Sequence, residues 1–177
     1  RQRQMCIRDS NLAGFAREHL GVWEMFAANS EIPESKWRKA RMVSSEIVDD
    51  RVVVSLDVSA ARRASVVVTG ATADGSLQSE VVFNDEVSPD VVATVRRLVD
   101  RWDVLGVCLD ASGPAGQWLS ALNEVGVEVK PFGSRMVAQA DGGFKEKVLA
   151  GRFVHVGQKV LDHAALAGMS KPVGDLW

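Results

Sequence analysis

Cysteine is scarce in this chain of 177 residues, which contains only Cys6 and Cys108. Two cysteines encode no disulfide framework, and this scarcity indicates a reducing compartment. Long hydrophobic runs are also missing. Apolar runs such as residues 52–54 and 66–68 fall far short of the roughly 20 residues that a membrane helix needs. The sequence therefore predicts no membrane-spanning segment.

Several chemical signatures are absent as well. The sequence contains no GxxxxGK[ST] or GxGxxG phosphate loop, no HExxH motif and no paired CxxC motif. These absences give no support to nucleotide binding through such loops or to the usual zinc sites. The formal net charge is −2, so nucleic-acid binding would need a local basic surface.

The composition that remains, 46% hydrophobic and 25% charged, is typical of a globular domain. A chain of this length buries roughly two-thirds of its unfolded surface. It therefore needs neither disulfides nor a structural metal to fold.

The two ends of the chain differ from the middle. Residues 1–10 have no apolar period and resemble a translated sequencing adaptor, so we exclude them from the fold. Residues 11–50, with a short helix expected in 11–25, form a lead-in or linker segment containing a lone Trp37. The compact domain is predicted over 51–177, and its end at Trp177, shortly after Pro172 and Gly174, is interpreted as a truncation.

Hydrophobic periodicity predicts an α/β fold. Three β-branched runs precede a region of alternating helices and strands, and Asp74-Gly75 marks a hairpin between two of these runs. Ser88-Pro89 opens the first amphipathic helix. We expect a mixed sheet of three antiparallel strands followed by helix-linked parallel strands, with helices on its faces. The expected strands are 51–58, 64–70, 77–84, 104–109 and 127–132, and residues 152–156 form either a short strand or an extended loop. The expected helices are 88–102, 112–125, 136–150 and 160–167.

Two aspartates stand out in this pattern. Asp57 lies within an apolar strand, where an unpaired buried charge would cost several kcal/mol, and Asp110 ends the strand 104–109. A right-handed crossover can place these strands side by side, with the two carboxylates roughly 4.8 Å apart. Such a pair requires a proton or a cation, and Mg²⁺ or Mn²⁺ fits oxygen ligands of this kind. The alternative is that both aspartates only accept hydrogen bonds from turn amides.

The strand order, with acids at the ends of its first and fourth strands, is that of ribonuclease H-like nucleases. Within it, Asp57 with Ser59 and Arg62-Arg63, then segments 107–115 and 144–155, resemble the nuclease domain of a tailed-phage terminase large subunit. Segment 16–23, followed by Ile32-Pro33 and Trp37, resembles the joint between the ATPase and the nuclease in that family.

The resemblance implies a metal-dependent endonuclease that cuts concatemeric phage DNA with two Mg²⁺ or Mn²⁺ ions. It makes Asp57 and Asp110 the first two metal ligands. The third is either Asp175 or an acid beyond Trp177, and Asp162 is a weaker option. Implied partners are double-stranded DNA, the ATPase domain of the same chain, the small terminase subunit and the portal, in the host cytoplasm.

Arg62, Arg63 and Arg135 are the predicted contacts to DNA phosphates. Lys145 and Lys147 are weaker candidates, which we interpret as solvated surface charges. Contacts of this kind are largely independent of base sequence. The three histidines, His19, His155 and His163, are interpreted as structural or surface residues. Two other functions stay open: a ribonuclease H-like nuclease of the resolvase or transposase type, and a non-catalytic DNA-binding or docking module.

Overall fold

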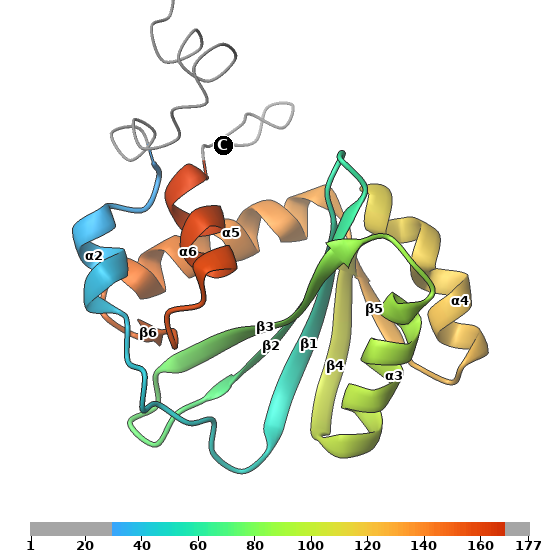
Figure 1. Cartoon of the computed structure of the whole chain (residues 1–177), viewed down its shortest axis with the longest axis horizontal. Coiled ribbons are helices and arrows are strands. Elements are labelled where there is room, and N and C mark those ends of the chain that lie inside the picture. The colour runs from blue at the N-terminus through green and yellow to red at the C-terminus, as the bar shows by residue number, and fades with distance from the viewer. Residues whose placement is uncertain (1–29, 169–177) are drawn as a thin grey trace, which may run out of the picture.

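The computed structural model describes residues 30–168 of the chain (Figure 1). The segment 1–10, the helix expected in 11–25 and the candidate ligand Asp175 lie outside the described residues. Cys6 and His19 lie outside them too.

The described residues form a mixed sheet with strand order β5-β4-β1-β2-β3-β6. Strands β1 (Arg51–Val58), β2 (Arg63–Ala71) and β3 (Leu77–Glu86) are consecutive and antiparallel. Strand β4 (Asp103–Asp110) runs parallel to β1, and β5 (Val129–Phe132) runs parallel to β4. The short β6 (Phe153–Val154) pairs with β3 in parallel. The predicted architecture, three antiparallel strands followed by helix-linked parallel ones, is confirmed.

Helices cover both faces of this sheet. Figure 1 shows α3 (Asp90–Arg101) and α4 (Leu119–Glu124) together on one side, while α5 (Ser134–Leu149) runs behind the strands. The predicted helix 112–125 is divided into a 3-10 turn, η2 (Pro114–Trp118), and α4. The helix expected from Ser88 begins at Asp90, whose N–H is bonded to the Ser88 hydroxyl at 3.3 Å.

The main core lies between the sheet and the α3–α4 layer, because β1 and β2 alternate strictly between buried and more exposed positions. In β1 the buried residues are the even-numbered ones, and in β2 they are also even-numbered, so both strands direct aliphatic side chains to one face. These side chains pack against the apolar stripes of α3 and α4. The central members of this core are Val52, Val54, Leu56, Val66, Val91, Val95, Val107, Leu109 and Leu122.

A second, aromatic core joins α2 (Glu34–Lys39) to α5, β6 and α6 (Lys159–Ala167). Trp37 is only 1% exposed and stacks on His155, with ring centroids 4.1 Å apart. It also lies 5.7 Å from the ring of Phe153. The tryptophan that the sequence left in a polar lead-in segment is therefore packed on the body of the domain. The division of the chain at residue 50 stays a prediction.

No helix within residues 30–168 is long and apolar enough to cross a membrane.

Candidate active site

Strand register brings the two predicted aspartates together. The parallel pairing of β1 and β4 includes Ser55 with Cys108 and Leu56 with Leu109. The next residues along the two strands are Asp57 and Asp110. Because side chains alternate across a strand, both carboxylates lie on the face opposite the aliphatic core, at one level of neighbouring strands. Their Cα atoms are thus about one strand spacing, roughly 4.8 Å, apart.

The burial expected for Asp57 is wrong. Asp57 is exposed, whereas Leu56 and Val58 on either side of it are buried. The sequence placed Asp57 inside an apolar strand, but the pleat of that strand buries only alternate residues. Asp57 consequently carries no desolvation cost in this structure, and its placement rests on the register of β1 with β4.

Asp110 is held in a defined orientation at the end of β4. Its Oδ1 atom accepts a hydrogen bond from the Ser112 N–H at 2.8 Å, as aspartates commonly do in turns. The turn also passes so close that a Cβ atom at Gly113 would lie 2.9 Å from Asp110 Oδ2. A side chain at position 113 would therefore displace the carboxylate. The turn contact suggested as the alternative role of Asp110 is present, and it engages Oδ1.

The acids belong to a row of side chains that crosses the sheet. Asp57 is paired with Ser65 on β2, and Ser65 is paired with Asn84 on β3. On the other side, Asp110 is paired with Phe132 on β5. Alternation places these side chains on one face, so two carboxylates, a hydroxyl and an amide follow each other across four strands. Ser65 and Asn84 were not singled out from the sequence, because only the register of distant segments aligns them with Asp57.

Two of the predicted DNA contacts lie in the hairpin between β1 and β2. Arg62 adopts a left-handed backbone with φ +59°, which is uncommon for any residue other than glycine. Arg63 opens β2, and its Nη2 donates to the Asn84 carbonyl at 3.2 Å and to Asn84 Oδ1 at 3.3 Å. Both arginines are at the end of the sheet where Asp57 lies.

The third predicted contact, Arg135, approaches from the opposite side. It is exposed in the first turn of α5, three residues after Phe132, the register partner of Asp110. The hairpin arginines and Arg135 therefore lie on either side of the two acids, toward β2 and toward β5. Whether they contact DNA stays a prediction.

Other candidate residues lie away from this row. Lys145 forms an ion pair with Glu31, so its positive charge already has a partner within the chain. Lys147 is an exposed residue near the end of α5. Asp162 accepts a hydrogen bond from Trp37 Nε1 at 2.8 Å and so belongs to the aromatic core. It contributes nothing to the pair of acids on β1 and β4.

His155 has a structural role in the same aromatic core. Its Nε2 atom lies 3.1 Å from the Trp37 carbonyl oxygen, which can only accept, so Nε2 carries a proton. Its Nδ1 atom accepts from the Gly157 N–H at 3.2 Å. Both ring nitrogens are thereby engaged within the domain, as the interpretation of this histidine as structural requires.

The donor set fits a hard divalent cation. Carboxylate oxygens are the ligands that Mg²⁺ and Mn²⁺ prefer, and Asp57 is open to solvent while Asp110 is half-buried. Within residues 30–168, no group of three or more histidine, cysteine or acidic side chains could hold a metal ion. Within residues 30–168, the two predicted ligands Asp57 and Asp110 are therefore not joined by a third such side chain.

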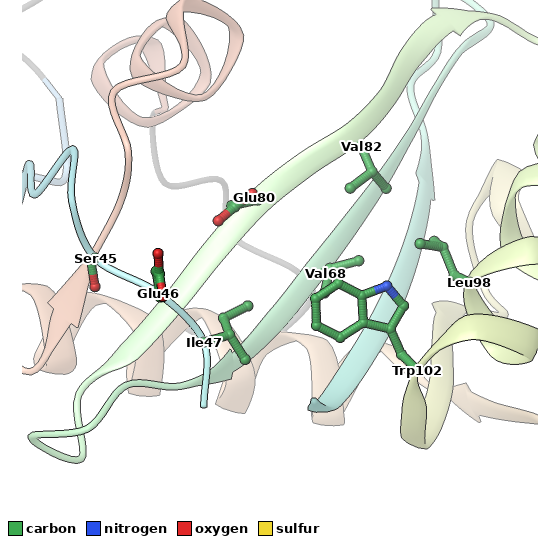
Figure 2. A pocket seen from close by; sticks show the side chains of 8 residues that line it. All are labelled: Ser45, Glu46, Ile47, Val68, Glu80, Val82, Leu98 and Trp102. Atoms are coloured by element: carbon green, nitrogen blue, oxygen red, sulfur yellow. The ribbon is translucent and has the colours of Figure 1, made fainter. Parts of the chain in front are cut away.

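A cavity lies on the other face of the sheet. It has a volume of about 290 Å³ and is lined by Val68 of β2 and by Leu98 and Trp102 at the end of α3. Figure 2 shows the Trp102 ring beside Val68, with Ile47 and Val82 along the same hollow. Val68 shares its face with the aliphatic core, so this cavity is separated from Asp57 by the sheet.

Comparison with known proteins supports the fold. No protein-family model matches the chain, and no curated protein matches it significantly. Among solved structures, the large terminase of bacteriophage HK97 superposes with a TM-score of 0.63 and 16% sequence identity, over 77% of this chain and 36% of that chain. The fold is ribonuclease H-like. The resemblance to a large terminase noted in the sequence is confirmed at the level of the fold.

A second solved structure is RuvC of T. thermophilus in complex with a Holliday junction substrate. It superposes with a TM-score of 0.37 and 16% identity, over 66% of this chain and 88% of that chain.

Proposed function

We propose that this chain is the nuclease domain of a phage terminase large subunit, which cuts double-stranded DNA with the help of two Mg²⁺ or Mn²⁺ ions. The observation that carries the proposal is the register of β1 with β4. Asp57 and Asp110 directly follow its pair of Leu56 with Leu109, on the face of a ribonuclease H-like sheet opposite the aliphatic core. A likeness of fold alone would not select these two residues.

In this proposal Asp57 and Asp110 hold the metal ions, and the third ligand is Asp175 or an acid beyond Trp177. The ions would activate water as a nucleophile and neutralise charge at the scissile phosphate. The Ser112 amide fixes Asp110 through Oδ1, so that its carboxylate keeps one orientation.

The basic residues bind the substrate in this scheme. Arg62 and Arg63 on the β2 side and Arg135 on the β5 side contact phosphates of the duplex. Such contacts position the duplex without reading its sequence. In the complete terminase, the ATPase domain would precede this domain in the chain, and the small subunit and portal would complete the packaging machine that receives the cut genome.

The decisive experiment measures nicking and linearisation of supercoiled plasmid in Mn²⁺ and in Mg²⁺. Because one candidate ligand lies beyond Trp177, the 177-residue chain is assayed beside a longer product of the same reading frame. We expect Asp57→Asn and Asp110→Asn each to reduce the cleavage rate by roughly 100-fold or more, since metal-held charge stabilisation contributes several kcal/mol. A chelator should abolish cleavage by the unmodified chain.

Asp103→Asn is the matched control. Asp103 lies on β4 like Asp110, but at the other end of the strand, where it forms an exposed ion pair with Arg51 at 3.4 Å. Exposed pairs contribute little to stability, so this variant should cut like the unmodified chain. The proposal is refuted if Asp57→Asn and Asp110→Asn both still cut DNA. It is also refuted if the longer product cuts DNA in neither metal.

Substrate comparison separates the remaining nuclease types. The same protein is given linear duplex, a four-way junction and an RNA–DNA hybrid at equal concentration. A terminase nuclease should cut the linear duplex at least as well as the junction. A strong preference for the junction would instead favour a resolvase.

A further inference from the structure

The guanidinium of Arg63 is oriented by a neutral partner. Both of its hydrogen bonds come from Nη2 and go to the carbonyl and side-chain oxygens of Asn84. Within the described part of the chain, Arg63 forms no ion pair, although Glu86 is its register partner across the β2–β3 ladder. The positive charge is therefore held in place without being neutralised, and its Nε and Nη1 donors remain for a ligand.

The position of this charge relative to the acids follows from the register. Asn84 lies two strands from Asp57 in the row that also contains Ser65. Two strand spacings amount to roughly 10 Å. A cation anchored on Asn84 is therefore too far from Asp57 to serve the phosphate at which the acids act, and it suits a neighbouring phosphate of the same strand.

We propose that Asn84 is a positioning residue that holds Arg63 for a non-scissile phosphate, so that the bound DNA strand crosses the sheet from the acid pair toward β3. This inference rests on the proposed nuclease function. It adds a direction for the substrate and a residue that no motif in the sequence marks.

The chemistry of Asn84 explains why an amide suits this position. An amide oxygen accepts from a guanidinium while leaving the net charge of the pair at +1. A carboxylate at position 84 would bind Arg63 more strongly but would cancel that charge. Asn84→Asp should therefore keep the contact between β2 and β3 and lose the attraction for DNA, an outcome that a purely structural role for Asn84 would not produce.

The test is a salt titration of DNA binding by the full chain, carrying Asp57→Asn to prevent cutting and using a short fluorescent duplex in fluorescence anisotropy. Removal of one phosphate contact lowers the slope of log K against log salt by about 0.9. We expect Arg63→Ala to lower the slope by about that amount and Asn84→Asp to match it. Asn84→Ala should weaken binding several-fold, and the double variant Arg63→Ala/Asn84→Ala should bind no more weakly than Arg63→Ala.

Asn123→Asp is the control for net charge, because Asn123 is an exposed residue of α4 and its substitution adds the same charge elsewhere. The inference is overturned if Asn84→Asp binds like Asn123→Asp, if Arg63→Ala leaves the slope unchanged, or if the two alanine substitutions weaken binding independently. Thermal unfolding of every variant shows whether a loss of binding reflects loss of fold.

Cleavage assays distinguish failure of this inference from failure of the proposed function. In a chain with Asp57 intact, Asn84→Asp and Arg63→Ala should raise KM several-fold and change kcat by less than about threefold, because a remote phosphate contact acts mainly on binding. If the unmodified chain cuts DNA and these variants behave like Asn123→Asp, only the role of Asn84 is refuted. If the unmodified chain neither binds nor cuts duplex DNA, both proposals fall.

Discussion

The two hairpins of the antiparallel strands close in different ways. Between β2 and β3, the left-handed position is occupied by Gly75, at φ +81°, a conformation that glycine adopts without strain. Asp74 beside it accepts hydrogen bonds from the Thr72 hydroxyl at 2.6 Å and from the Ser76 N–H at 3.1 Å. Between β1 and β2, the left-handed position is occupied by Arg62, at φ +59°.

The two hairpins, at opposite ends of the sheet, therefore differ in backbone strain. A left-handed backbone costs an L residue roughly 1–2 kcal/mol, and glycine avoids that cost. The Gly75 hairpin follows the rules of turn chemistry. The Arg62 hairpin breaks these rules beside Asp57 and Asp110. Asp49 and Asp50 also have positive φ, so the strain at Arg62 is distinguished by its position beside the two acids.

The largest effect on stability is expected when Gly75 of the β2–β3 hairpin is replaced by arginine, the residue at the left-handed position of the β1–β2 hairpin. A Cβ atom at position 75 has no neighbouring atom within 4 Å, so the cost expected for Gly75→Arg is backbone strain. Because φ +81° lies beyond the left-handed minimum near +57°, we expect a loss of about 1–2 kcal/mol in the free energy of unfolding. Urea denaturation measures it. DNA affinity should not fall, and a fall would show that this end of the sheet also binds DNA.

The reverse exchange should give a smaller effect of opposite sign on stability. Arg62→Gly removes the strain but adds freedom to the unfolded chain, so we expect a gain of about 0.5–1 kcal/mol. The same change removes one cation, and DNA affinity should fall, with the salt slope lowered by about 0.9. Arg62→Ala is the matched control, since it removes the charge and keeps the strain. If Arg62→Gly leaves DNA binding intact, the strained arginine has no part in the proposed interface.

The hairpins also show how far the sequence alone could predict the structure. Asp74-Gly75 was recognised as a turn because its chemistry is local, and the strands flanking it were recognised from β-branched runs. The pairing of Asp57 with Asp110 was anticipated from topology, yet the exposure of Asp57 was not, since an apolar run does not say which alternate residues face a core. Asn84 was missed because its neighbours in the row are distant in sequence. Trp37 was left in a linker because its partners, His155 and Phe153, lie more than a hundred residues further on.

The smallest expected effect concerns the pH dependence of the two hairpins. The hydrogen bond from the Thr72 hydroxyl, followed by that from the Ser76 amide, lowers the pKa of Asp74 from its ordinary value of 3.8. A carboxyl with a lowered folded-state pKa contributes stability above its unfolded pKa and loses it as the pH falls through the folded value. Asp74→Asn should therefore lower the melting temperature slightly at neutral pH, and the difference from the unmodified chain should shrink below pH 3.8 and then disappear.

The corresponding acceptor in the other hairpin does not titrate. The Ser59 hydroxyl oxygen accepts from the Arg63 N–H at 3.2 Å. Ser59→Ala should thus shift the melting temperature by the same amount at every pH. Calorimetry of both variants across an acid series measures the contrast. An Asp74→Asn effect that persists unchanged in acid would mean that the β2–β3 turn depends on the shape of this side chain and not on its charge.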